Sequence, residues 1–113
     1  IEKNNFLFKK IERSPTFLYK DFLMRGNLIN LDLTAGSFEG KEDIYFEFHN
    51  RSNSFIGNAD SFHAGLEENL VYFSNIFLSN GEEYDMKSEY IKINIETMQL
   101  ESNGSFELVI KND

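Results

Sequence analysis

An alternation of apolar and polar residues with a period of two runs through four segments of this chain: 28–34, 43–49, 90–96 and 106–111. Successive side chains of a β-strand point to opposite faces, so this period indicates strands with one apolar and one polar face. Antiparallel sheets that have a core on one side show this pattern. The sequence therefore predicts a mainly β, antiparallel fold.

Two other features extend the β prediction. Residues 70–78 are almost continuously apolar, which indicates a strand that is covered on both faces or that contacts another protein. After Ile95 the apolar positions shift to Met98 and Leu100, which changes their parity. A β-bulge near 96–97 would return both sets to the same face.

Asn-Gly pairs stand at 80–81 and 103–104. This pair favours the positive φ angles of a tight hairpin turn. The second pair predicts a hairpin between residues 90–101 and 105–111. The first pair is followed by 82–88, where apolar residues are few, so that segment is predicted as a loop or a short edge strand.

The first 26 residues have a different pattern. Ser14 is a candidate N-cap, Pro15 suits a first helical turn, and Gly26 suits a C-terminal cap, so residues 15–25 are predicted as an amphipathic helix. A strand is the alternative, because 17–24 is also rich in aromatic residues and a turn at 25–27 would make a hairpin.

Two segments complete the expected organisation. Residues 5–11, with Phe6 and Phe8, suit an edge strand, and 49–66 is predicted as a long irregular loop because Asn, Ser, Gly and Asp dominate it.

The length of 113 residues predicts one domain, 1–113, with an N-terminal element at 1–26 and an antiparallel β region at 27–113. We expect an antiparallel β-sandwich or half-open barrel of about six strands with one N-terminal helix. The alternative is an α+β arrangement, in which the helix covers one open antiparallel sheet.

The composition excludes several kinds of protein. There are no cysteines, so disulfides and thiolate zinc sites are absent, and the apolar runs are too short for a transmembrane helix. The chain starts at Ile1, so a removed export signal is one expectation. We therefore expect a cytoplasmic location if the chain is an immunity protein, and the cell envelope or the exterior if a signal was removed.

The net charge of −8 is unevenly distributed: residues 1–25 carry +3 and residues 26–113 carry −11. An acidic surface repels phosphate backbones and anionic headgroups, so nucleic acid is not expected as a partner. The acidity serves either solubility or the attraction of a basic protein partner.

No motif for catalysis or cofactor binding is present. The chain has no G-x-S-x-G elbow and no glycine-rich phosphate loop, so we predict a protein that is not an enzyme and that needs no cofactor. No metal site is predicted. The only candidates are His49 and His63, with Asp60 or Glu67, and the spacing of the histidines matches no local ligand motif.

These features together favour a non-enzymatic protein-binding domain, most concretely a small acidic bacterial inhibitor or immunity protein that neutralises a basic toxin. Acidic residues would face the toxin and tyrosines would anchor it. The predicted contact residues are Glu42, Asp43, Tyr45, Glu47, Glu82, Glu83, Tyr84 and Asp85. The alternative is an extracellular or envelope β-sandwich domain that binds a ligand or packs in a surface assembly. The candidates for lining a shallow groove are the five tyrosines Tyr19, Tyr45, Tyr72, Tyr84 and Tyr90.

Overall fold

The computed structural model describes residues 5–9, 15–51, 54–65 and 67–111, which form nine β-strands and no helix. The prediction of a mainly β, antiparallel fold is confirmed. The strands are β1 (Asn5–Lys9), β2 (Thr16–Tyr19), β3 (Phe22–Arg25), β4 (Leu28–Asp32), β5 (Ser37–His49), β6 (Ser54–Gly65), β7 (Leu70–Ser79), β8 (Tyr84–Asn94) and β9 (Gln99–Ile110).

All the strands belong to one hydrogen-bonded sheet with the order β1-β4-β5-β6-β7-β8-β9, while β2 pairs with β3 and β3 pairs with β5. Neighbours are antiparallel throughout. A sandwich or half-open barrel of about six strands is therefore not confirmed, because the described strands form a single continuous sheet of nine.

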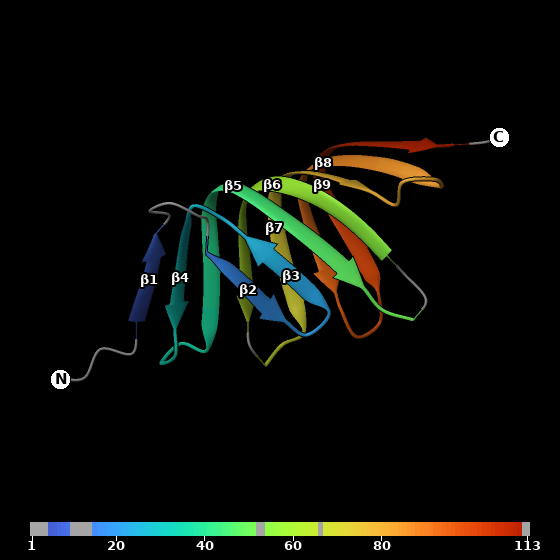
Figure 1. Ribbon diagram of the computed structural model, residues 1–113. Helices are drawn as coiled ribbons and strands as arrows, with labels where there is room; N and C mark the ends of the chain where they lie inside the picture. The colour runs from blue at the N-terminus through green and yellow to red at the C-terminus, as the bar shows by residue number, and fades with distance from the viewer. Residues whose placement is uncertain (1–4, 10–14, 52–53, 66, 112–113) are drawn as a thin grey trace.

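The long strands bend near their middle, which folds the sheet into two layers (Figure 1). In β5 the register shifts between Lys41 and Ile44, and Asn75 and Gly104 have positive φ at the bends of β7 and β9. The β4 layer comprises β1, β4 and residues 37–41, 61–65, 70–74, 90–94 and 99–103, and the β3 layer comprises β2, β3 and residues 44–49, 54–59, 76–79, 84–88 and 106–110.

Phenylalanine rings from both layers meet in the core. Phe46 of the β3 layer lies 4.5 Å from Phe73 of the β4 layer, measured between ring centroids, and Phe22 lies 4.8 Å from Phe48. All four side chains are almost completely buried. Gly57 makes room for this packing, because a Cβ there would lie 2.7 Å from Cζ of Phe46.

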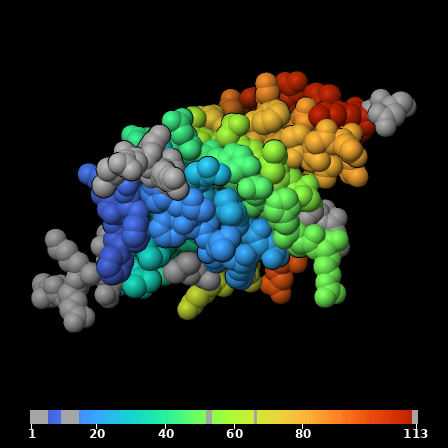
Figure 2. Space-filling model, viewed as in Figure 1, coloured from blue at the N-terminus to red at the C-terminus, as the bar shows by residue number. Residues whose placement is uncertain are grey.

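The β2–β3 hairpin closes the interior at its N-terminal end. The Tyr19 hydroxyl donates a hydrogen bond of 2.9 Å to the Gly65 carbonyl, which joins the two layers. Phe17 of β2 meets Phe8 of β1 edge-on at 5.0 Å. Figure 2 shows this hairpin, in blue, at the surface beside β5, while β9, in red, lies at the opposite end of the molecule.

The predicted helix at 15–25 is wrong, because this segment is the β2–β3 hairpin. Tyr19, Phe22 and Met24 all point inward and are buried, and Lys20 has a positive φ of 54° in the turn between the strands. The alternative of a strand is correct in kind, but the turn lies at 20–21 rather than at 25–27. Ser14, the predicted N-cap, lies outside the described residues.

The predicted loop at 49–66 is also wrong over most of its length, since it contains β6. The inward positions of β6 include Gly57, Ala59 and Ala64. Because these residues have a small side chain or none, the sequence gives little apolar signal at positions that are buried in the structure.

The hairpin predicted at the second Asn-Gly pair is wrong, whereas the first pair, whose following segment was predicted as a loop or a short edge strand, lies in a hairpin turn. Residues 80–83 form the turn between β7 and β8, whereas 103–104 lies inside β9, at its bend. Both arms of β9 pair with β8. The shift in parity near 96–97 marks the β8–β9 turn at 95–98 rather than a bulge.

Candidate functional site

The apolar inner face of the core continues onto β9, where it becomes exposed. Leu78, Met86 and Leu108 are successive cross-strand partners on β7, β8 and β9. Leu78 is fully buried, Met86 is half-buried, and Leu108 is 45% exposed. The inner face of the sheet is therefore buried at β7 and exposed at β9.

The neighbouring rows behave in the same way. Ile76 and Ser88 are buried, but their partner in the next strand, Phe106, is 47% exposed. The apolar residues of β9 that point inward are Leu100, Phe106, Leu108 and Ile110. We call them the β9 inner face. Every residue of β9 is exposed, whereas at the N-terminal end the β2–β3 hairpin covers the interior.

The outer edge of β9 pairs with no other strand among the described residues, and the same holds for β1 at the other end of the sheet. Phe6, Leu7 and Phe8 of β1 are exposed as well. An unpaired edge presents a row of N–H and C=O groups that can accept a further strand. Exposed apolar patches beside such an edge are typical of binding surfaces.

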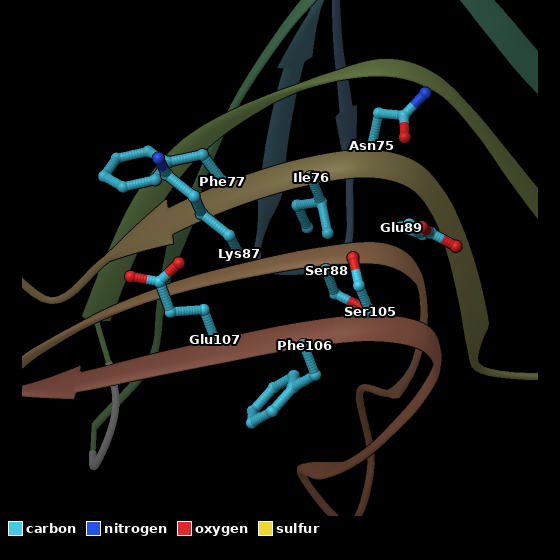
Figure 3. Close-up of a pocket in the computed structure, with 9 residues that line it drawn as sticks. All are labelled: Asn75, Ile76, Phe77, Lys87, Ser88, Glu89, Ser105, Phe106 and Glu107. Atoms are coloured by element: carbon cyan, nitrogen blue, oxygen red, sulfur yellow. The ribbon is translucent and has the colours of Figure 1, made fainter.

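A hollow of about 410 Å³ lies between β7, β8 and β9, at the bend of the sheet. Figure 3 shows Phe106 projecting from one side of β9 and Glu107 from the other. Ile76 and Phe106 contribute apolar atoms to the hollow, while Lys87 and Glu107 contribute charged groups. Because Phe106 and Glu107 project to opposite sides of β9, the charged groups of Lys87 and Glu107 lie on the face of the sheet opposite to the β9 inner face.

The outer side of this end is held by charged hydrogen bonds. Asp85 accepts a hydrogen bond of 2.6 Å from the Ser79 hydroxyl and lies 3.0 Å from the Lys111 ammonium. These two contacts hold the pKa of Asp85 below its ordinary value. On the inner side, burial and the nearby Glu83 raise the pKa of Tyr84.

Comparisons with known proteins bear on the fold. No family model and no curated protein matches the chain. Among solved structures, LptH from Pseudomonas aeruginosa, described as the LptA-homologous periplasmic component of the conserved lipopolysaccharide transport device, matches with a TM-score of 0.80. The match covers 97% of this chain and 86% of LptH at 9% sequence identity. The chain has an LptA-like fold.

This likeness contradicts the prediction of an immunity protein or toxin inhibitor. LptH is a component of a transport device, and its fold is the one seen here. The alternative, an envelope domain that binds a ligand or packs in an assembly, agrees better with that fold. No segment of the described chain is a helix long and apolar enough to span a membrane.

The structure separates the residues predicted to bind a basic partner. Glu42 and Asp43 lie at the bend of β5, whereas Glu82 and Glu83 lie in the turn at the far end of the β3 layer. About five residues of strand, or roughly 17 Å, stand between these two places. A basic partner is not supported by the LptA-like fold, and binding of any partner by these acidic residues stays a prediction.

The two predicted tyrosine anchors lie on opposite faces of the β3 layer. Tyr45 faces outward, where the Arg25 guanidinium lies 5.0 Å from its ring centroid, and Glu47 lies beside it on the same strand. Tyr84 faces inward and is half-buried against the core, although Asp85 next to it faces outward. Binding of a partner by these residues stays a prediction.

The two histidines lie on different layers. His49 accepts or donates a hydrogen bond of 2.8 Å with the Ser54 hydroxyl and lies 3.3 Å from Glu47, whereas His63 lies 3.8 Å from Glu39. Among the described residues, no group of three His, Cys, Asp or Glu side chains has the geometry of a metal site.

The sequence predicted a strand at 105–111, which covers the second arm of β9, but it did not predict the exposure of that arm. Residues Phe106, Leu108 and Ile110 were expected to be core, because they have the parity of core residues. Val109 was the available signal, since it is an apolar residue on the opposite face of the same strand and is 48% exposed. On that opposite face Val109 lies between Glu107 and Lys111, so it is a single apolar side chain among charged ones.

Proposed function

We propose that this chain is a non-enzymatic domain of the bacterial cell envelope that binds the acyl chains of lipopolysaccharide, or of a similar amphipathic lipid, on the β9 inner face. A neighbouring protein that docks at the free edge of β9 would deliver or receive the lipid. The single observation that carries this proposal is the continuation of the buried apolar face over β9, where nothing among the described residues covers it.

An acyl chain binds where it can bury its methylene groups against exposed apolar side chains. Burial of each methylene group contributes about 0.8 kcal/mol, so several methylenes against exposed leucine, isoleucine and phenylalanine side chains give useful affinity. The N-terminal part of the interior is already filled by rings such as Phe22, Phe46 and Phe73. The open part along β9 is therefore the place where a lipid adds contacts without displacing the core.

The comparison supports the compartment and the class of cargo. LptH is described as a periplasmic part of a lipopolysaccharide transport device. The free edges of β1 and β9 support a protein partner, because strand addition at a sheet edge supplies backbone hydrogen bonds and places side chains in register.

The experiment uses two neighbouring positions with equal exposure on opposite faces. Leu108 is 45% exposed on the inner face and Val109 is 48% exposed on the outer face. Each is replaced in turn by the photoreactive residue p-benzoylphenylalanine, and the protein is irradiated with lipopolysaccharide and analysed by mass spectrometry.

We expect a lipid adduct from position 108 and little from position 109. Equal labelling at both positions would mean adsorption to any apolar surface. Absence of an adduct at 108, under conditions where free photoreactive residue labels the lipid, would refute the proposal.

A further inference from the structure

A second surface lies on the outer face of the β4 layer, away from the β9 inner face. Three ring side chains gather there on neighbouring strands. Tyr72 is the cross-strand partner of His63, and its ring centroid lies 6.2 Å from the imidazole and 6.1 Å from the Tyr90 ring. Val71, Phe73 and Ile91, which alternate with these residues, are buried on the inner face.

The rings border a shallow hollow of about 430 Å³, which we call the tyrosine groove. This volume lies within the usual range for sites that bind small molecules. Tyr90 is 39% exposed, and the planes of Tyr72 and Tyr90 are inclined by 38°. Hydrogen-bonding side chains complete the lining; they are Glu39, Lys41, Ser61, His63, Glu68 and Ser74.

The charges beside the groove are largely balanced. Lys92, next to Tyr72 across the strands, forms an ion pair of 2.9 Å with Glu101, and Glu39 lies 3.8 Å from the His63 ring. Within the lining, two carboxylates stand against one ammonium group. This balance disfavours an anionic ligand such as a phosphate.

The lining also distinguishes this groove from a lipid site. It has tyrosine rings and polar groups but no exposed aliphatic side chain, in contrast to the β9 inner face. A ring face with neighbouring donors and acceptors fits a molecule that is itself apolar on one face and rich in hydroxyl groups at its edges. A pyranose sugar has this character, because its axial C–H groups form an apolar face.

We propose that the tyrosine groove binds a neutral pyranose unit of a glycan, with the sugar face on Tyr72 and Tyr90 and its hydroxyl groups bonded to the surrounding carboxylates and hydroxyls. This site goes beyond lipid binding and does not depend on it. The glycan would be either a free polysaccharide strand or the saccharide part of a glycolipid, and both present the same chemistry.

The test is an NMR titration of the full chain with chitotriose, maltotriose and mannotriose, and with the oligosaccharide released from lipopolysaccharide by removal of its acyl chains. Weak sugar sites have dissociation constants of about 1 mM, so probe concentrations up to about 10 mM fill such a site. We expect shift changes that centre on Tyr72, Tyr90 and His63. A response to the released oligosaccharide alone assigns the glycolipid as the source, and a response to a neutral trisaccharide assigns a free glycan.

Substitutions separate this site from the rest of the molecule. The double substitution Tyr72→Ala with Tyr90→Ala is expected to weaken sugar binding by about tenfold or more, whereas Tyr45→Ala, on the outer face of the other layer, leaves it unchanged. Thermal unfolding of both variants verifies the fold. Crosslinking of lipopolysaccharide at position 108 continues in the double variant, so failure of one proposal is distinguishable from failure of the other. No response to any of the four probes, or equal binding by the double variant, would overturn the inference.

Discussion

Phe46 and Phe106 provide a direct test of whether the β9 inner face is open. Both side chains project inward from the β3 layer, but Phe46 is fully buried and Phe106 is 47% exposed. Replacing a buried phenylalanine by alanine costs about 3–5 kcal/mol, because contacts are lost and a cavity remains. Complete burial of phenylalanine contributes about 1.5–3 kcal/mol, so a side chain left half-exposed contributes roughly half of that. We therefore expect Phe106→Ala to lower the free energy of unfolding by only about 0.8–1.5 kcal/mol.

Urea unfolding followed by far-UV circular dichroism measures both variants, with the free energy of unfolding obtained by linear extrapolation. The experiment is repeated over a range of protein concentrations, because a second copy that covers β9 would make the stability depend on concentration. If Phe106→Ala costs as much as Phe46→Ala in dilute protein, the β9 inner face is covered. The reasoning that places a ligand there would then be wrong.

Two further outcomes follow from single hydrogen bonds. Tyr19→Phe removes the hydroxyl that bonds to the Gly65 carbonyl but keeps the ring. The free energy of unfolding should therefore fall by about 0.5–1.5 kcal/mol in the same urea assay. An unchanged value would mean that this hydrogen bond does not hold the two layers together. The pKa of Asp85 lies below its ordinary value of 3.8, first because of the Ser79 hydroxyl and then because of Lys111. Its stabilising contribution is therefore complete above that ordinary value and is lost as the pH falls through the lower pKa of the folded state. The difference in thermal stability between the protein and Asp85→Asn should shrink as the pH falls below about 4, and a difference that is constant with pH would contradict this assignment.

The alternation of residues was sufficient to predict individual strands and their inward faces. In β5, Ile44, Phe46 and Phe48 were expected on one face, and all three are buried. In β8 the same holds for Ile91 and Ile93. Local period predicts these positions because each arm of the strand is straight and has a core on one side.

The hairpin at 16–25 could not be predicted in this way, because no single period crosses its turn. Inward positions are odd in β2, at Phe17 and Tyr19, and even in β3, at Phe22 and Met24. The resulting mixture resembles the spacing of an amphipathic helix. Pairing of β3 with β5 decides the outcome, and the paired residues run from Phe22 with Phe48 to Arg25 with Tyr45, far apart in sequence.

The bend of β9 could not be predicted from its Asn-Gly pair. An Asn-Gly pair indicates a positive φ, and Gly104 has one, at 87°. That backbone angle is compatible with a hairpin turn and also with a bend in a continuing strand. Residues on both sides of the bend pair with β8, so β9 continues instead of folding back on itself.

The position of the candidate lipid site could not be predicted from the alternation of apolar and polar residues, because it depends on which strands are covered. Parity assigns a side chain to a face, but it does not say whether another layer covers that face. Phe106 and Leu108 have the same parity pattern as Phe46 and Phe48, yet only the latter pair lies beneath rings contributed by β3 and the β4 layer. The cover depends on the order of strands in the sheet, in which β3 pairs with β5 at one end and, among the described strands, β9 pairs only with β8. An exposed apolar face that continues a core therefore has the same sequence pattern as a buried core strand. Only the topology of the sheet shows which of the two strands is covered.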